Sequence, residues 1–78
     1  MRLQIRTVKV TPESWEARIV SQVRDNHLRC HGASPDESVY RLAVEYLQRR
    51  HTNPLYQDQV RLTPVYYSEN FCYYAFKP

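Results

Sequence analysis

The sequence contains very little glycine and lysine, and it has no long apolar run. Gly32 is the only glycine among 78 residues, which excludes the glycine-rich loops that bind nucleotide phosphates. No stretch of about 18 apolar residues is available to cross a membrane, and Met1 to Arg6 lack the apolar core of a signal peptide. We therefore expect a cytoplasmic protein without membrane contact.

Cysteine is also scarce. The two cysteines, Cys30 and Cys72, are too few for the disulfide framework of a small secreted domain, so we expect two reduced thiols in the core. His27 and His31 lie near Cys30, but the paired Cys-x-x-Cys spacing of structural zinc sites is missing. In a strand, Cys30 would face the core and both histidines would face outward. We predict no metal and no other cofactor.

No motif brings a Ser or Cys nucleophile together with a His and an acid. We therefore predict no catalytic residues, and a binding role in place of an enzymatic one. The composition, 42% apolar and 24% charged, is that of one globular domain over residues 1–78.

The basic residues are nine Arg and only Lys9 and Lys77, and the formal net charge is +3. The planar fork of arginine suits phosphate and carboxylate recognition, although codon usage explains the bias equally well. Net charge by itself indicates only solubility and nonspecific attraction.

Residues 34–37, Ser-Pro-Asp-Glu, form a typical helix start, with Ser as cap, Pro in the first helical position and two acids near the positive end of the helix dipole. Apolar residues follow at helical spacing: Val39, Leu42, Ala43, Tyr46 and Leu47. The pattern predicts a helix over residues 35–51, ended by Asn53-Pro54.

The segment 11–32 fits two structures. Read with a period of two, apolar and polar residues from Trp15 onward alternate, and a hairpin turning at residues 25–26 sets Val23 opposite Leu28 and Ser21 opposite Cys30. This hairpin is favoured. A helix over residues 12–29 is the alternative, but it would place Glu16 and His27 in its apolar stripe.

A first strand, from about Leu3 to Val10, can join the hairpin through the loop 11–14, which sets Lys9 opposite Glu16. The alternation slips between Ile5 and Val8, which predicts a bulge near residues 6–7.

Two further strands are expected over residues 59–67 and 71–77, and Pro64 places the first of them at an edge or a bulge. The fold class is therefore α+β, in the order β-β-β-α-β-β. One helix packs on one face of a three-stranded antiparallel sheet, followed by an aromatic C-terminal strand or hairpin. If residues 12–29 are helical, the alternative is a ribbon-helix-helix-like fold.

The stretch Trp15-Glu16-Ala17-Arg18-Ile19, followed by residues 31–38 (His-Gly-Ala-Ser-Pro-Asp-Glu-Ser) before an amphipathic helix, resembles the HicB-like antitoxin family. The likeness covers about residues 3–50, and its motif is short and structural. It implies a truncated RNase H-like fold that contacts a partner protein, often as a dimer, without catalytic residues. Ser38 stands where the family usually has Ala, and no separate DNA-binding module follows, which puts operator binding of the family's kind in doubt.

The strand assignment gathers basic residues on the sheet face turned away from the helix, with Arg2 and Gln4 beside them. The C-terminal segment adds more aromatic residues than one small core needs. From these two groups we predict the following partner-binding residues: Arg18, Arg24, His27, Arg29, His31, Arg6, Tyr66, Tyr67, Tyr73 and Tyr74. An ordinary solvated face and a completed core explain the same patterns equally well.

These features favour a small non-enzymatic regulator or inhibitor that acts by protein–protein contact. It would be antitoxin-like, or a phage-type inhibitor of a nucleic-acid-processing complex such as an anti-CRISPR, with a homodimer through an aromatic edge strand as one form. The alternative is direct nucleic-acid binding by the basic Arg/His sheet face.

Overall fold

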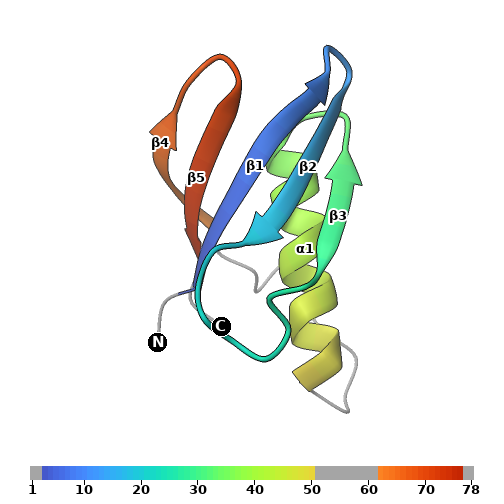
Figure 1. The fold of residues 1–78 in the computed structure, drawn as a ribbon, viewed down its shortest axis with the longest axis vertical. Helices are drawn as coiled ribbons and strands as arrows, with labels where there is room; N and C mark the ends of the chain where they lie inside the picture. The colour runs from blue at the N-terminus through green and yellow to red at the C-terminus, as the bar shows by residue number, and fades with distance from the viewer. Residues whose placement is uncertain (1–2, 51–61, 77–78) are drawn as a thin grey trace.

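The computed structural model describes residues 3–50 and 62–76, which form five strands and one helix (Figure 1). In chain order these are β1 (Leu3–Thr11), β2 (Ser14–Ile19), β3 (Arg29–Gly32), α1 (Pro35–Arg50), β4 (Leu62–Tyr67) and β5 (Phe71–Phe76). The strands form one antiparallel sheet in the order β3-β2-β1-β5-β4. The predicted α+β class is confirmed, with the C-terminal hairpin joining the same sheet beside β1. Within the described ranges, no helix is long and apolar enough to cross a membrane.

Helix α1 begins where the sequence predicts. The Ser34 hydroxyl accepts a hydrogen bond from the Glu37 amide at 3.2 Å, and the Glu37 carboxylate accepts one from the Ala33 amide at 3.2 Å. The first bond satisfies an amide that a helix start leaves without a partner, and the second ties Glu37 to the residue before the cap. The predicted last residue, His51, lies outside the described residues.

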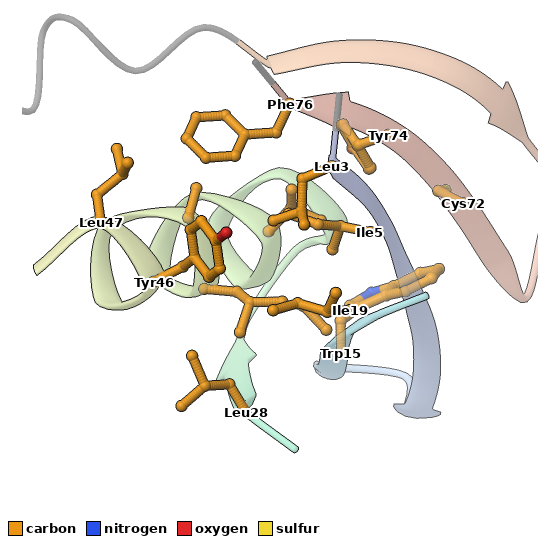
Figure 2. Close-up of a cluster of buried hydrophobic side chains, with 14 residues drawn as sticks. Leu3, Ile5, Trp15, Ile19, Leu28, Tyr46, Leu47, Cys72, Tyr74 and Phe76 are labelled. Atoms are coloured by element: carbon orange, nitrogen blue, oxygen red, sulfur yellow. The ribbon is translucent and has the colours of Figure 1, made fainter. Parts of the chain in front are cut away.

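The core lies between α1 and one face of the sheet (Figure 2). The helix supplies the five apolar residues that the spacing predicts, all of them buried: Val39, Leu42, Ala43, Tyr46 and Leu47. Strand β5 contributes Cys72, Tyr74 and Phe76 to the same cluster. Predicted strand residues 59–61 and Lys77 lie outside the described residues.

Residues 12–29 are not helical, so the ribbon-helix-helix alternative is wrong. The chain does turn at residues 24–27, around the predicted position. The predicted hairpin and its register are wrong, however, because β2 ends at Ile19 and Ala17, in place of Ser21, lies opposite Cys30. Ile19 pairs with Ile5, and β1 begins only two residues earlier, so β2 soon runs out of partner backbone. The register differs from the predicted one by four residues, an even number, so the residues that do lie in β2 and β3 keep their predicted faces.

The segment 20–28 is therefore a loop and not the continuation of two strands. The Ser21 hydroxyl accepts a hydrogen bond from the Gln4 amide at 2.9 Å, and the Val20 amide donates to the Gln4 carbonyl at 2.8 Å. Leu28 is buried and Val23 packs against the core, so the loop still covers one end of it.

The bulge predicted near residues 6–7 is absent. Leu3, Ile5 and Thr7 are all buried on the helix side, and the register shift in β1 lies between Lys9 and Thr11. Consequently Glu16 pairs with Val8, and Lys9 pairs with Trp15. Thr7 takes the inward position that hydrophobicity assigns to Val8.

Thr7 is buried because α1 satisfies its hydroxyl. The Thr7 Oγ1 atom is 2.6 Å from Ser38 Oγ, and Ser38 in turn donates to the Pro35 carbonyl at 2.8 Å. A buried hydroxyl with a partner avoids most of the cost of leaving water. This pair therefore joins β1 to the first turn of α1.

The prediction for Pro64 is confirmed on both counts. Strand β4 is an edge strand, and its register against β5 shifts between Pro64 and Tyr66. Proline has no N–H to donate, so it is tolerated where the ladder is interrupted.

The single glycine permits close packing of β3 against the helix start. A Cβ atom at Gly32 would lie 2.6 Å from the Ser38 amide nitrogen and 2.9 Å from the Glu37 carbonyl carbon, both of them backbone atoms. Those atoms can move only if the whole first turn of α1 moves.

We therefore expect Gly32→Ala to destabilise the domain by about 1–3 kcal/mol through overpacking. The measurement is urea unfolding followed by circular dichroism. Exposed Ala33→Ser, one residue further on, is the control and should unfold near the wild-type midpoint. Equal midpoints for all three proteins would contradict the close packing.

Candidate functional site

The sheet face opposite α1 is not covered by any other described element (Figure 1). We call it the open face. Because the helix-side residues of β1 and β2 are buried, their alternate residues point to this open face. Four of the predicted basic residues lie on it: Arg6, Arg18, Arg29 and His31.

One continuous row of paired residues crosses all five strands on the open face. Cross-strand pairing places the following residues side by side: Tyr66, Tyr73, Arg6, Arg18 and Arg29. We call this the Arg/Tyr row. With neighbouring strands about 4.8 Å apart, it is about 19 Å long. Its two ends differ in chemistry, with aromatic rings on β4 and β5 and guanidinium groups on β1, β2 and β3.

A second, parallel row consists of Phe71, Val8, Glu16 and His31. Phe71 links the two rows at their aromatic end, because its ring stacks on Tyr66 with centroids 5.6 Å apart and meets Tyr73 edge-on at 5.8 Å. The rings therefore form one cluster on the open face.

Glu16 is the only acidic residue in these two rows, and it contacts three basic side chains. Its carboxylate oxygens lie 2.9 Å from Arg18 Nη2, 3.2 Å from His31 Nε2 and 4.0 Å from Arg29 Nε. The hydrogen bond from Arg18 lowers the pKa of Glu16, partly opposed by burial, and the nearby positive charges lower it further. Glu16 is therefore ionised at neutral pH.

Arg6, unlike Arg18 and Arg29, has no acidic partner among the described residues. Among the described residues, no carboxylate lies within salt-bridge distance of its guanidinium, and its register neighbours are Arg18 and Tyr73. The Nε atoms of Arg6 and Arg18 are both buried without a hydrogen-bond partner. Like charges directly opposite each other destabilise a sheet, so stability does not explain why two arginines are paired here.

Two shallow hollows adjoin Tyr73 on this surface. One, of about 300 Å³, is lined by Arg6, Val8, Asn70, Phe71 and Tyr73. The other, of about 260 Å³, is lined by Gln4, Val65, Tyr66, Tyr73 and Tyr74. The Arg/Tyr row is thus flanked by space on the Val8 side and on the Gln4 side.

The predicted partner-binding residues divide into three groups. Those on the open face are Arg6, Arg18, Arg29, His31, Tyr66 and Tyr73. Arg24 and His27 lie in the loop 20–28, because β2 ends before them. Tyr67 and Tyr74 point to the helix side of the sheet. Arg2, expected beside the basic face, lies outside the described residues.

Tyr74 is a correction, because it is buried and belongs to the core. Its hydroxyl donates a hydrogen bond to Asp36 at the start of α1 and lies 3.1 Å from the Tyr67 hydroxyl. Burial, reinforced by the hydrogen bond to Asp36, raises the pKa of Tyr74 well above its ordinary value. Tyr74 therefore fastens the helix to β5, and it reaches the surface only at the hollow beside Tyr73.

The sequence prediction missed Val8 and Val65 and left Phe71 out of the site. Val8 was missed because Thr7 takes the inward position of β1. Val65 follows Pro64 at the register shift, which alternation alone does not locate. Phe71 is on the open face because its pairing with Val8 fixes its side.

The Cys/His cluster does not converge on one point. Cys30 is half-buried and lines a hollow with Tyr40 and Val44 of α1, while His31 reaches Glu16 on the opposite face. Burial raises the pKa of the Cys30 thiol. Both cysteines are free, as predicted, and β2 and β1 lie between their strands. No group of three His, Cys, Asp or Glu side chains that could hold a metal occurs in the described part of the chain.

No family model, curated protein or solved structure matches this chain. No matching protein therefore bears on the functional proposals, which rest on the residues and surfaces of the chain itself.

The pairing of Glu16 should make stability depend on pH. A lowered pKa in the folded state stabilises the fold at pH values above the ordinary pKa of 4.5, and that stabilisation is lost as pH falls through the folded-state pKa. We expect Glu16→Gln to cost about 0.5–1 kcal/mol at pH 7, since the pair is partly exposed, and progressively less below pH 4.5. Thermal unfolding of both proteins across this pH range measures the difference.

The control is Glu45→Gln, which removes only an exposed helix pair with Arg49 at 3.4 Å. Its effect at pH 7 should be smaller, about 0.3 kcal/mol. If Glu16→Gln matched the wild type at pH 7, the network around Glu16 would contribute nothing to stability.

Proposed function

We propose that this chain is a small non-enzymatic regulator or inhibitor that acts by binding another protein through its aromatic edge. The aromatic edge consists of Val65, Tyr66, Tyr67 and Phe71. The main support is that these four large side chains are exposed together, with exposed fractions of 66%, 51%, 52% and 37% in that order. The proposal assigns no catalytic residue.

The aromatic edge wraps around β4. Tyr66 stacks on Phe71 on the open face, whereas Tyr67 points to the helix side, where its ring meets Tyr74. Strand β4 carries no charged residue. Exposed apolar patches mark interaction sites, and Tyr and Phe are enriched at protein interfaces. The other exposed valines, Val10 and Val20, belong to different parts of the fold and need no such explanation.

The two edges of the sheet differ in a way that supports contact at β4. Strand β3 has four residues, and its His31 carbonyl accepts a hydrogen bond from Arg41 of α1 at 2.9 Å. Within the described residues, no side chain donates to the backbone of β4 in this manner. An edge strand without charges can pair with a strand of a second chain. Pro64 has no backbone N–H to donate, so such pairing is expected at the residues that follow it in β4.

The resemblance to HicB-like antitoxins supports the same class of function, since those proteins contact a partner protein and often dimerise. An antitoxin-like regulator and an inhibitor of a nucleic-acid-processing complex, such as an anti-CRISPR, both act in this way. A second copy of the chain, paired through β4, is one form of the contact.

Val65→Glu tests the proposal and has a closely matched control in Val10→Glu, because both valines are more than half exposed, at 66% and 58%. The full chain and both variants are used to capture partners from the native host, with quantitative mass spectrometry. Their own mass is measured by light scattering. Burying a carboxylate at an interface should reduce partner recovery about 30-fold, the effect of losing a hot-spot residue.

Val10→Glu should capture the partner as the wild type does. If the partner is a second copy, the wild type should scatter as a dimer and Val65→Glu as a monomer. Equal recovery by both variants, or a wild type that neither dimerises nor captures a specific protein, would reject the aromatic edge as the contact.

A further inference from the structure

We infer that the open face is a second binding site and that it binds single-stranded nucleic acid. Its ligand therefore differs from that of the aromatic edge, which binds a protein in the proposal above. Phosphates would lie against Arg6, Arg18 and Arg29, and a base would stack on Tyr73. This inference goes beyond the proposed protein contact and does not depend on it.

The charges of the open face call for an anionic ligand. Three guanidinium groups lie in adjacent positions of the Arg/Tyr row, and the single carboxylate beside them, Glu16, contacts Arg18 and Arg29 but not Arg6. Arg6 and Arg18 also keep buried Nε atoms without partners. A phosphate accepts hydrogen bonds from an arginine fork, and it would offset the repulsion between these two side chains.

The aromatic end of the row favours a nucleic acid over an acidic protein. Tyr73 is directly beside Arg6 in the sheet register, and a hollow of about 300 Å³ is lined by both residues together with Val8 and Phe71. A nucleobase offers a flat ring to Tyr73 while its own phosphate reaches Arg6. An acidic peptide would satisfy the arginines but supply nothing planar for Tyr73.

The shape of the face favours a single strand over a duplex. Proteins read duplex DNA by inserting a helix or a two-stranded ribbon into a groove, and among the described elements none projects from the open face. Bases splayed from a single strand can lie flat on a sheet and stack on its aromatic residues. The absence of a projecting element is therefore no obstacle to this ligand.

Fluorescence anisotropy with the full chain tests the inference. The probes are labelled oligo(dT) and oligo(U) of about 12 nucleotides, within the usual range for one such surface, a duplex of the same length, and a poly-glutamate peptide. Both single strands should bind. Three phosphate contacts predict a salt slope of about −2.1, so raising salt from about 50 to about 200 mM should weaken binding about 18-fold.

Variants of the row separate stacking from charge. Tyr73→Leu should weaken binding about 5- to 150-fold, as loss of one stacked base does, whereas Tyr73→Phe keeps the ring and should bind like the wild type. Arg6→Gln should weaken binding and reduce the magnitude of the salt slope by about 0.7. Arg49→Gln removes the same charge from an exposed position on α1 and should leave the slope unchanged. Circular dichroism confirms that each variant is folded.

Four results would overturn the inference: no binding of either single strand at low salt, a duplex bound as tightly as the single strands, poly-glutamate bound as tightly as the single strands, or equal effects of Arg6→Gln and Arg49→Gln. Tighter binding of oligo(U) would identify RNA as the ligand, and tighter binding of oligo(dT) would identify DNA. Either preference supports the inference. Partner capture through Val65 is measured separately, so failure of either site leaves the other standing.

Discussion

The fold depends on how closely the first turn of α1 packs against the sheet. At Gly32 no room exists for even one methyl group, and on either side of that point polar contacts fasten the helix to strands far away in the sequence. The Thr7 hydroxyl meets Ser38, and the Tyr74 hydroxyl donates to Asp36. The start of α1, and the face of the sheet that it buries, are therefore determined by three features together: Gly32, the hydroxyl pair of Thr7 and Ser38, and the Asp36 carboxylate.

Burial of one face leaves the other free to carry charge. A domain of this size gains little stability to spare, and opposing Arg6 to Arg18 reduces it further. Residues that conflict with local stability are commonly retained at functional sites. The open face and the aromatic edge are adjacent, because Tyr66 and Phe71 belong to both, so a partner at the edge and a strand on the face would lie next to each other.

Much of this arrangement could be predicted from local patterns. The Ser34 cap and the helical spacing located α1, and the alternation from Trp15 to Ile19 assigned Arg18 to the outer face. Arg6, Arg29 and His31 were also placed correctly, although the predicted register was not. Because side chains alternate between the two faces of a strand, a register error of four residues, an even number, leaves each strand residue on its predicted face.

The remaining features depend on contacts that a linear pattern does not contain. Thr7 is buried only because Ser38 lies above it, so hydrophobicity assigned its position to Val8. Tyr66 and Tyr67 are consecutive, as are Tyr73 and Tyr74, and one of each pair must face the helix. For Tyr66 and Tyr67 the register shift beside Pro64 decides which one does, and for Tyr73 and Tyr74 the pairing of β5 with β1 decides it. No local signal locates either the shift or this pairing. The sequence could therefore predict an aromatic C-terminal hairpin without separating its exposed rings from the buried ring of Tyr74.

The loop 20–28 has a consequence for how this protein can change over evolutionary time. In a tight hairpin, the turn sets the register, and inserting one residue disturbs everything beyond it. Here β2 and β3 are held in register by packing on α1, and nine residues of irregular chain join them. Insertions or deletions in this loop need not move Arg18, so related chains can differ in length at this point and still present that arginine. Arg29 depends more on the loop, because its guanidinium donates hydrogen bonds to the Asn26 and Leu28 carbonyls.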